Sequence, residues 1–279
     1  MKKISRRSFM AAAAVSVAAL ALTACGGSAS SAASSVASSA ASSEAASSAA
    51  TAELTTVEAG KLTMATNAAF PPYEMTTDAG EFEGIDVDTA KAIAEKLGLE
   101  LQIDDMDFDA ALLSVQQGKA DIVMAGVTVT DERKAVMDFS DSYATGIQSI
   151  IVPNDSDIAS PDDLAGKTIG TQRGTTGYIY CSDDFGDENV VAYDDGLTAV
   201  QALNNGQVDA VVIDNAPAQE FVAANPGLKI LDTAYAQEDY AIGVAKGNTQ
   251  LLDAINGALE ELQADGTLQA IVDKYITAE

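Results

Sequence analysis

The sequence predicts an α/β protein made of two similar lobes. After residue 54, short runs rich in Val and Ile alternate with Ala- and Leu-rich segments in which apolar residues recur at helical spacing. Segments 112–126 and 199–214 both contain the end of a helix, then a glycine, then a strand that begins with an aspartate. Because alternating strands and helices build parallel sheets, this repeated order predicts two α/β units of the same plan.

The first unit begins with a predicted strand at 61–66. Residues 67–75 follow as a predicted loop, since the two prolines within it suit neither a helix nor an interior strand. A helix is predicted over 85–97, where the apolar residues share one face and the next residue is a glycine suited to end it. Alternating apolar residues then predict a strand at 99–104.

The rest of the first unit repeats the alternation of helix and strand. The pattern predicts a helix over 108–119, a strand over 120–129 and a further helix that begins at Thr130. The β-branched run at 145–153 predicts a strand that leaves this unit.

The second unit contains four predicted strands and two predicted helices. The strands are expected at 167–172, 189–193, 208–215 and 228–232, and the helices at 196–207 and from Thr176. A strand at 239–246 then returns to the first unit, and helices at 249–266 and 268–276 close the chain. Two crossings between units predict two hinge segments, near 143–147 and 238–242.

These crossings define the expected domains. Lobe 1 is predicted to contain residues 54–144 and 240–279, and lobe 2 residues 145–239. Since sheets of this kind bind ligands at the carboxyl ends of their strands, the ligand is expected in the cleft between the lobes.

The N-terminal 53 residues are excluded from the folded body. Residues 1–24 have the basic start and short apolar core of an export signal, and the sequence "LTAC" ending at Cys25 is similar to the lipidation site of bacterial lipoproteins. A plain signal peptide is the alternative, and the pair Arg6-Arg7 leaves a twin-arginine export route open. Residues 25–53 are mostly Ser and Ala and predict a tether.

The charge and the rare residues exclude several classes of function. The chain carries a net charge of −27, and removal of residues 1–24, which hold four basic and no acidic side chains, makes it −31. Such a surface repels nucleic acid and anionic headgroups. With no histidine, and one cysteine left if Cys25 is lipidated, no zinc or copper site and no Ser-His or Cys-His nucleophile is expected, and no cofactor is predicted.

Four loops follow predicted strands and face the expected cleft: 67–73, 125–133, 173–177 and 214–215. Three of them carry small or polar residues ahead of a helix, whose free N–H groups suit a carboxylate.

Two charged residues in these loops are the main binding candidates. Arg133 lies in the first turn of a helix, where a cation opposes the helix dipole, so either a carboxylate clamp or an exposed pair with Asp131 or Glu132 could explain it. Asp214 could accept an ammonium group or could instead cap the following segment.

Three aromatic residues are expected on loops rather than on helical faces: Phe70, Tyr73 and Phe108. In a chain with few aromatics they suggest flat apolar walls for a ligand, although Tyr73 could equally anchor its loop to the lobe.

Six segments, in order, resemble the polar amino-acid solute-binding proteins of bacterial ABC importers. They are 65–75 ("ATNAAFPPYEM"), 80–98, 106–143, 160–176, 208–218 and 259–276, and together they span the chain after the tether. This resemblance implies the type II periplasmic-binding-protein fold, in which two Rossmann-like lobes joined by two hinges close on the ligand.

The resemblance also implies roles for individual residues. Arg133 is expected to clamp the ligand carboxylate, supported by Thr128, Thr175 and Thr176. Asp214 is expected to accept the ligand ammonium, helped by the Gly126 carbonyl and the Thr128 hydroxyl. Phe70 and Phe108 are expected to flank the side chain, and Asn67 to lie near its tip. The candidate ligand residues are Asn67, Phe70, Phe108, Ala125, Gly126, Thr128, Arg133, Thr175, Thr176 and Asp214. No metal ligand and no catalytic residue is expected.

The implied function is capture of a polar or basic amino acid and its delivery to importer permease subunits. The protein would be a monomer, held by its lipid at the extracytoplasmic face of the cell membrane. Family members that bind basic amino acids often carry an acidic residue where this chain has Asn67, and glutamine binders carry a cationic residue near Gln172. This chain has neither, so the resemblance does not determine the side chain of the ligand, and cystine is among the candidates. The alternative is a cyclohexadienyl or arogenate dehydratase on the same fold, with Glu74 or Asp214 as its acid.

Overall fold

The computed structural model describes residues 54–276. The predicted export signal (1–24), the lipidation candidate Cys25 and the tether (25–53) lie outside these residues. Within the part of the chain that is described, no helix is long and apolar enough to cross a membrane.

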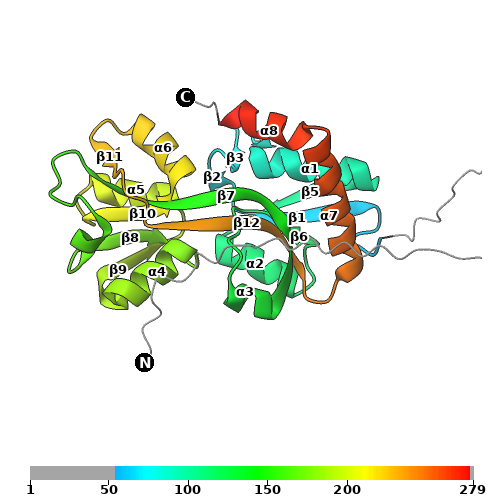
Figure 1. Ribbon diagram of the computed structural model, residues 1–279, viewed down its shortest axis with the longest axis horizontal. Coiled ribbons are helices and arrows are strands. Elements are labelled where there is room, and N and C mark those ends of the chain that lie inside the picture. The colour runs from blue at the N-terminus through cyan, green and yellow to red at the C-terminus, as the bar shows by residue number, and fades with distance from the viewer. Residues whose placement is uncertain (1–53, 277–279) are drawn as a thin grey trace, which may run out of the picture. The chain divides into compact units, whose positions relative to one another are not determined.

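A mixed sheet of nine strands runs through the described residues (Figure 1). Its strand order is β5-β1-β6-β12-β7-β10-β8-β9, and β11 pairs with β7 on the edge opposite β10. The strands are β1 (Lys61–Thr66), β5 (Glu100–Asp105), β6 (Ile122–Val123), β7 (Met137–Pro153), β8 (Ile169–Gln172), β9 (Val190–Tyr193), β10 (Ala210–Asp214), β11 (Leu228–Ile230) and β12 (Ala236–Ala245).

Two parallel groups of strands flank a central antiparallel pair. β1 pairs in parallel with β5 and β6, and β8 pairs in parallel with β9 and β10, so the two predicted parallel units are confirmed. Between them, β7 and β12 run antiparallel from Met137 to Gln148 and carry the chain from one group to the other and back (Figure 1). The boundaries of the two lobes stay a prediction.

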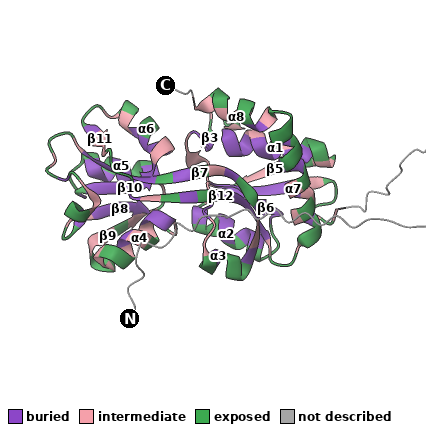
Figure 2. Ribbon diagram, in the orientation of Figure 1, coloured by how far each residue is buried: buried purple, intermediate pink, exposed green. Residues whose placement is uncertain are grey.

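Helices cover the sheet on both sides of this pair. On the β1 side, α1 (Ile85–Leu97), α7 (Thr249–Ala264) and α8 (Thr267–Tyr275) pack on one another, and α2 (Phe108–Gln116) packs on β1, β6 and β12. On the other side, α4 (Thr176–Phe185) and α5 (Gly196–Asn204) pack on β8, β9 and β10, and α6 (Asn215–Ala224) on β7, β10 and β11. Buried residues gather along the strands beneath them (Figure 2).

Several predicted boundaries are wrong, and each error has a local cause. The predicted loop 67–75 contains β2 (Ala69–Phe70) and the start of β3 (Glu74–Thr76), which pairs with β4 (Phe82–Glu83) in a separate small sheet. Its two prolines form the turn between β2 and β3, where no ladder hydrogen bond is needed.

The predicted strand 120–129 shortens to β6 because the chain turns away at Gly126, whose φ of 54° no strand adopts. Helix α3 (Asp131–Val136) follows the N-cap Thr130, as predicted. Strand β7 comes directly after it and starts at Met137, eight residues before the predicted strand. Helix α2 ends at Gln116 rather than 119.

Helix α6 was not predicted at all. Pro217 occupies the first turn of this helix, where a missing N–H costs nothing.

Candidate ligand-binding site

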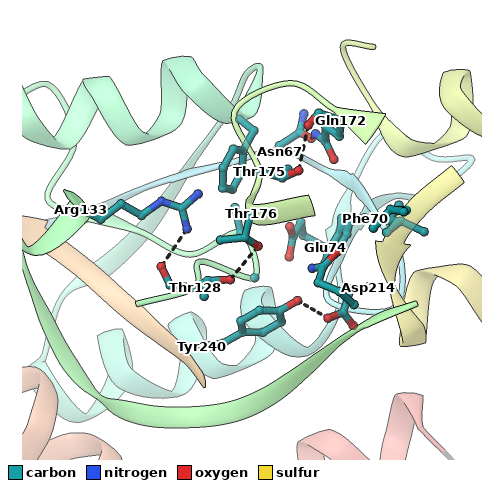
Figure 3. Close-up of a pocket in the computed structure, with 16 residues that line it drawn as sticks. Asn67, Phe70, Glu74, Thr128, Arg133, Gln172, Thr175, Thr176, Asp214 and Tyr240 are labelled. Atoms are coloured by element: carbon teal, nitrogen blue, oxygen red, sulfur yellow. Dashed lines mark hydrogen bonds between the residues drawn. The ribbon is translucent and has the colours of Figure 1, made fainter. Parts of the chain in front are cut away.

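A cavity of about 450 Å³, its open mouth included, lies where both strand groups end (Figure 3). All ten predicted ligand residues line it, although their role in binding stays a prediction. Six further residues line the same cavity: Glu74, Gln148, Gln172, Val212, Ile213 and Tyr240.

Arg133 forms one end of the cavity. It follows the N-cap Thr130, whose hydroxyl accepts the Arg133 N–H at 3.2 Å. Its guanidinium donates to the Thr128 carbonyl at 2.8 Å and to the Gly174 carbonyl at 3.1 Å, so it touches loops from both strand groups. The Phe108 ring lies 5.3 Å from the guanidinium carbon.

The alternative explanation of Arg133 as an exposed surface charge is wrong. Its side chain is only 8% exposed, and among residues 54–276 it makes no ion pair with Asp131 or Glu132. Burial lowers the pKa of Arg133, and Glu238 is the largest opposing influence. An arginine keeps its charge under such a shift, so the cavity contains a fixed cation.

Asp214 forms the opposite end, at the last residue of β10 (Figure 3). Its Oδ1 accepts the Ala216 N–H at 3.3 Å as the N-cap of α6, and its Oδ2 accepts the Tyr240 hydroxyl at 2.6 Å. The capping explanation is confirmed, and Asp214 also lines the cavity, while its role as the acceptor of an ammonium group stays a prediction. It is 2% exposed, and burial raises the pKa of Asp214 to about 6 against these hydrogen bonds.

Two glycines let these groups approach. A Cβ on Gly146 of β7 would lie 2.7 Å from Oδ2 of Asp214, so only a glycine leaves room for the contact between Asp214 and Tyr240. A Cβ on Gly126 would lie 2.9 Å from the Phe70 ring and 3.2 Å from the Tyr240 ring. The positions of Tyr240, Asp214 and Phe70 in the cavity wall therefore require glycine at 126 and at 146.

Three threonines line the middle of the cavity. Thr175 is the N-cap of α4, accepting the Tyr178 N–H at 3.4 Å, and its hydroxyl donates to the Gln172 carbonyl at 2.8 Å. The hydroxyls of Thr128 and Thr176 lie 3.5 Å apart and come from opposite strand groups. The first turn of α4 thus faces the cavity, where its free N–H groups suit an anion.

The segment after β1 contributes an apolar wall and the far end of the cavity. Phe70 stacks on Tyr73 with ring centroids 5.7 Å apart, but Tyr73 itself is 4% exposed in the core and does not line the cavity. Asn67 accepts a hydrogen bond from the Gln172 amide at 2.8 Å, which links the two strand groups at this end.

Two buried acids lie in the wall of the cavity or next to it. Glu74 lines its wall and Asp86 accepts the Gly126 N–H at 3.0 Å, and both are fully buried. Burial, followed by the neighbouring Asp86, raises the pKa of Glu74 well above its usual value, and burial raises the pKa of Asp86 to about 6. Burial and Asp86 both favour the neutral form of Glu74 over the ionised form.

Strand β12 contributes two residues to the site that were not predicted. Tyr240 lines the cavity, and Glu238 is hydrogen-bonded to two of its threonines. Their spacing of two residues places them on one face of the strand, but Glu238 lies between Gln237 and Asp239, so no local signal distinguished it. Nothing local linked them to Asp214 or to Thr128, more than 20 and 100 residues away.

Within residues 54–276, no group of three or more His, Cys, Asp or Glu side chains could hold a metal ion. The cavity instead offers a cation, an anion and hydrogen-bonding groups at fixed positions.

The fold and this cavity define the class of two-lobed type II periplasmic-binding proteins, in which two crossing strands join two α/β units around a ligand. Comparison with known proteins gives the family. Residues 62–278 match the bacterial extracellular solute-binding proteins, family 3, and the chain belongs to that family.

Individual relatives agree with this assignment. The chain is 34% identical to the L-cystine-binding protein TcyJ of Escherichia coli K12 over 80% of its length and 85% of that protein. It is 44% identical to arginine-bound ArgBP of T. maritima, with a TM-score of 0.70 over 73% of this chain and 96% of that one. An ancestral arginine-binding protein bound to glutamine is 42% identical, with a TM-score of 0.75 over 79% and 100%. These relatives are named as binding proteins and not as enzymes.

Proposed function

We propose that this protein captures a free amino acid in the cavity and delivers it unaltered to an importer of the cell membrane. The observation that carries the proposal is the pair of opposite charges, Arg133 and Asp214, buried at the two ends of one cavity. A zwitterion brings a carboxylate to one and an ammonium to the other. Neither a simple anion nor a simple cation satisfies both.

The same pair explains closure around the ligand. Arg133 belongs to the loop after β6 and Asp214 to the end of β10, so one ligand contacts both strand groups. A closed arrangement binds the zwitterion better than an open one, and the ligand therefore shifts the protein towards closure.

We propose a basic or amide side chain for the ligand, with arginine first. The far end contains the Asn67 and Gln172 amides, and the buried carboxyl of Glu74 also lines the cavity. Solved relatives bound to arginine and to glutamine support this choice.

A thermal-shift screen of the twenty amino acids, cystine and ornithine tests this proposal. Binding stabilises the folded state by mass action, so L-arginine is expected to give the largest shift and L-glutamine a smaller one. The absence of a shift with every compound would refute amino-acid binding. In parallel, incubation with prephenate or arogenate is expected to yield no product, and turnover would support the dehydratase alternative.

We further propose that residues 1–24 are removed and that lipid on Cys25 holds the protein, as a monomer, at the extracytoplasmic face near its permease. The "LTAC" sequence supports this anchor. Mass spectrometry of the mature chain is expected to give a diacylglyceryl mass in the wild type and none in Cys25→Ser, which should leave the membrane fraction. An unlipidated wild-type chain would contradict the anchor.

A further inference from the structure

Strand β12 brings a second carboxylate to the cavity threonines. Glu238 is 6% exposed, and a single oxygen, Oε2, accepts three hydrogen bonds. The donors are the Thr128 hydroxyl at 3.1 Å, the Thr176 hydroxyl at 2.9 Å and the Gln148 amide at 3.0 Å. Each donor comes from a different segment: the loop after β6, the start of α4 and β7.

The direction of these bonds fixes what the hydroxyls offer to a ligand. A threonine hydroxyl has one proton and two lone pairs. An oxygen that accepts from three donors carries no proton of its own, so Thr128 and Thr176 both direct their single proton to Glu238. Towards the cavity, both hydroxyls present only lone pairs and act as acceptors.

Thr128 is also tied to the Asp214 end of the cavity. It forms a β-bridge with Tyr240, the residue whose hydroxyl donates to Asp214. Figure 3 places Thr128 and Thr176 between Arg133 and the pair formed by Tyr240 and Asp214. An ammonium group held at Asp214 has three N–H donors and needs more than one acceptor.

We infer that Glu238 is a positioning residue for the ligand ammonium group, acting through the Thr128 hydroxyl. By taking the hydroxyl proton, Glu238 turns the oxygen into an acceptor that completes the site begun by Asp214. The Thr176 hydroxyl is held in the same way, so the ligand carboxylate is left to Arg133 and to the backbone N–H groups of α4. This inference rests on the proposed function, because it assumes an amino-acid ligand.

The test compares L-arginine with 5-guanidinopentanoate, which is arginine without its α-ammonium group. In Glu238→Leu, the affinity for L-arginine is expected to fall by about tenfold, the scale of a hydrogen bond to a charged group, while the affinity for 5-guanidinopentanoate changes by less than about twofold. Thr128→Val should give the same selective loss, and the double variant should lose little more than either single one, since both act through one hydroxyl. Equal losses for both ligands in Glu238→Leu would overturn the inference in favour of a structural role.

Two variants sharpen the comparison. Glu238→Gln is expected to retain most of the affinity, because the Gln148 amide donor keeps the new carbonyl oxygen at the Oε2 position and both threonines still donate to it. Asp239→Asn, which removes the exposed acid next along the strand, is expected to change neither affinity. Loss of L-arginine binding in Asp239→Asn equal to that in Glu238→Leu would also contradict the inference.

A measurement without ligand separates this inference from the proposed function. In the ligand-free protein, NMR is expected to detect slowly exchanging hydroxyl protons of Thr128 and Thr176, assigned by their loss in the Thr→Val variants. They should persist in Glu238→Gln and disappear in Glu238→Leu. If the wild type binds neither ligand, the arginine proposal fails. Hydroxyl protons unchanged in Glu238→Leu would overturn the role of Glu238.

Discussion

The two ends of the cavity are built differently, although each holds one buried charge. Arg133 donates to two backbone carbonyls, at Thr128 and Gly174, and keeps its charge although burial lowers its pKa. Asp214 depends on a tyrosine hydroxyl and a helix N-terminus, and burial raises its pKa to about 6. One end of the grip is therefore permanent, and the other can be switched off by a proton within the range of pH that bacteria meet.

Removing either charge is expected to have the largest effect. Arg133→Ala or Asp214→Ala leaves one ligand charge buried and unpaired, which costs about 2–5 kcal/mol, or roughly 30- to several-thousand-fold in affinity. Isothermal titration calorimetry with L-arginine at pH 7.5 measures it. Arg173→Ala is the control, because Arg173 is an exposed arginine on the same loop as Gly174 and pairs only loosely with Asp194. Affinity close to wild type in either test variant would refute the two-point grip.

The contrast between the two ends also separates what sequence could and could not predict. Thr130, Arg133 and Asp214 were predictable because caps and strand ends are local features, and a cation in a first helical turn needs an explanation beyond its helix. The α/β plan followed from apolar periodicity for the same reason.

Tyr240 and Glu238 were not predictable, because their function depends on contacts with residues distant in the chain. Their own segment has only the alternation of an ordinary strand, and its partners are set by the antiparallel pairing of β7 with β12. All the residues that this pairing joins are at least 88 positions apart in the chain, the separation of Ala236 from Gln148. Nothing in either segment specifies the register of the pairing.

Acid pH is expected to weaken the Asp214 end alone. Since Asp214 must be ionised to hold an ammonium and its pKa is about 6, the affinity for L-arginine should be level above pH 7 and fall by up to tenfold for each pH unit below 6. Calorimetry from pH 5 to pH 8 measures this profile. A slope steeper than one proton would mean that Glu74 or Asp86 also ionises on binding.

Asp214→Asn is the control for the pH profile. Its weak residual affinity for L-arginine should no longer fall as the pH is lowered below 6. A wild-type affinity that is constant down to pH 5 would contradict the assignment of the ammonium to Asp214.

The ligand-free protein should show the opposite dependence. A carboxyl whose folded-state pKa is raised above its unfolded value binds its proton more tightly when folded, so the folded state loses stability as pH rises from about 4 to about 6. Asp214→Asn removes this cost, and its ligand-free free energy of unfolding at pH 7 is expected to exceed that of the wild type by up to about 3 kcal/mol, because the pKa of Asp214 rises from 3.8 to about 6. Urea denaturation at pH 7 and pH 5 measures the difference. A gain of equal size at both values would show that the effect is not the cost of ionising Asp214.

Phe108 and Phe70 offer the smallest and most selective comparison, because each aromatic ring belongs to one end. The guanidinium carbon of Arg133 lies over the Phe108 ring, 5.3 Å from its centroid, whereas Phe70 packs beside Gly126 near Tyr240. Phe108→Leu keeps an apolar wall but removes a cation–π contact of about 0.5–1 kcal/mol, so affinity should fall roughly two- to fivefold. Because Arg133 does not titrate, this factor should be the same at pH 8 and at pH 5.5. Phe70→Leu changes the surroundings of Tyr240, the donor that stabilises ionised Asp214, so its effect should grow as pH falls. Calorimetry of both variants at the two pH values decides whether the permanent and the titratable ends act independently, and a pH-dependent loss in Phe108→Leu would show that they do not.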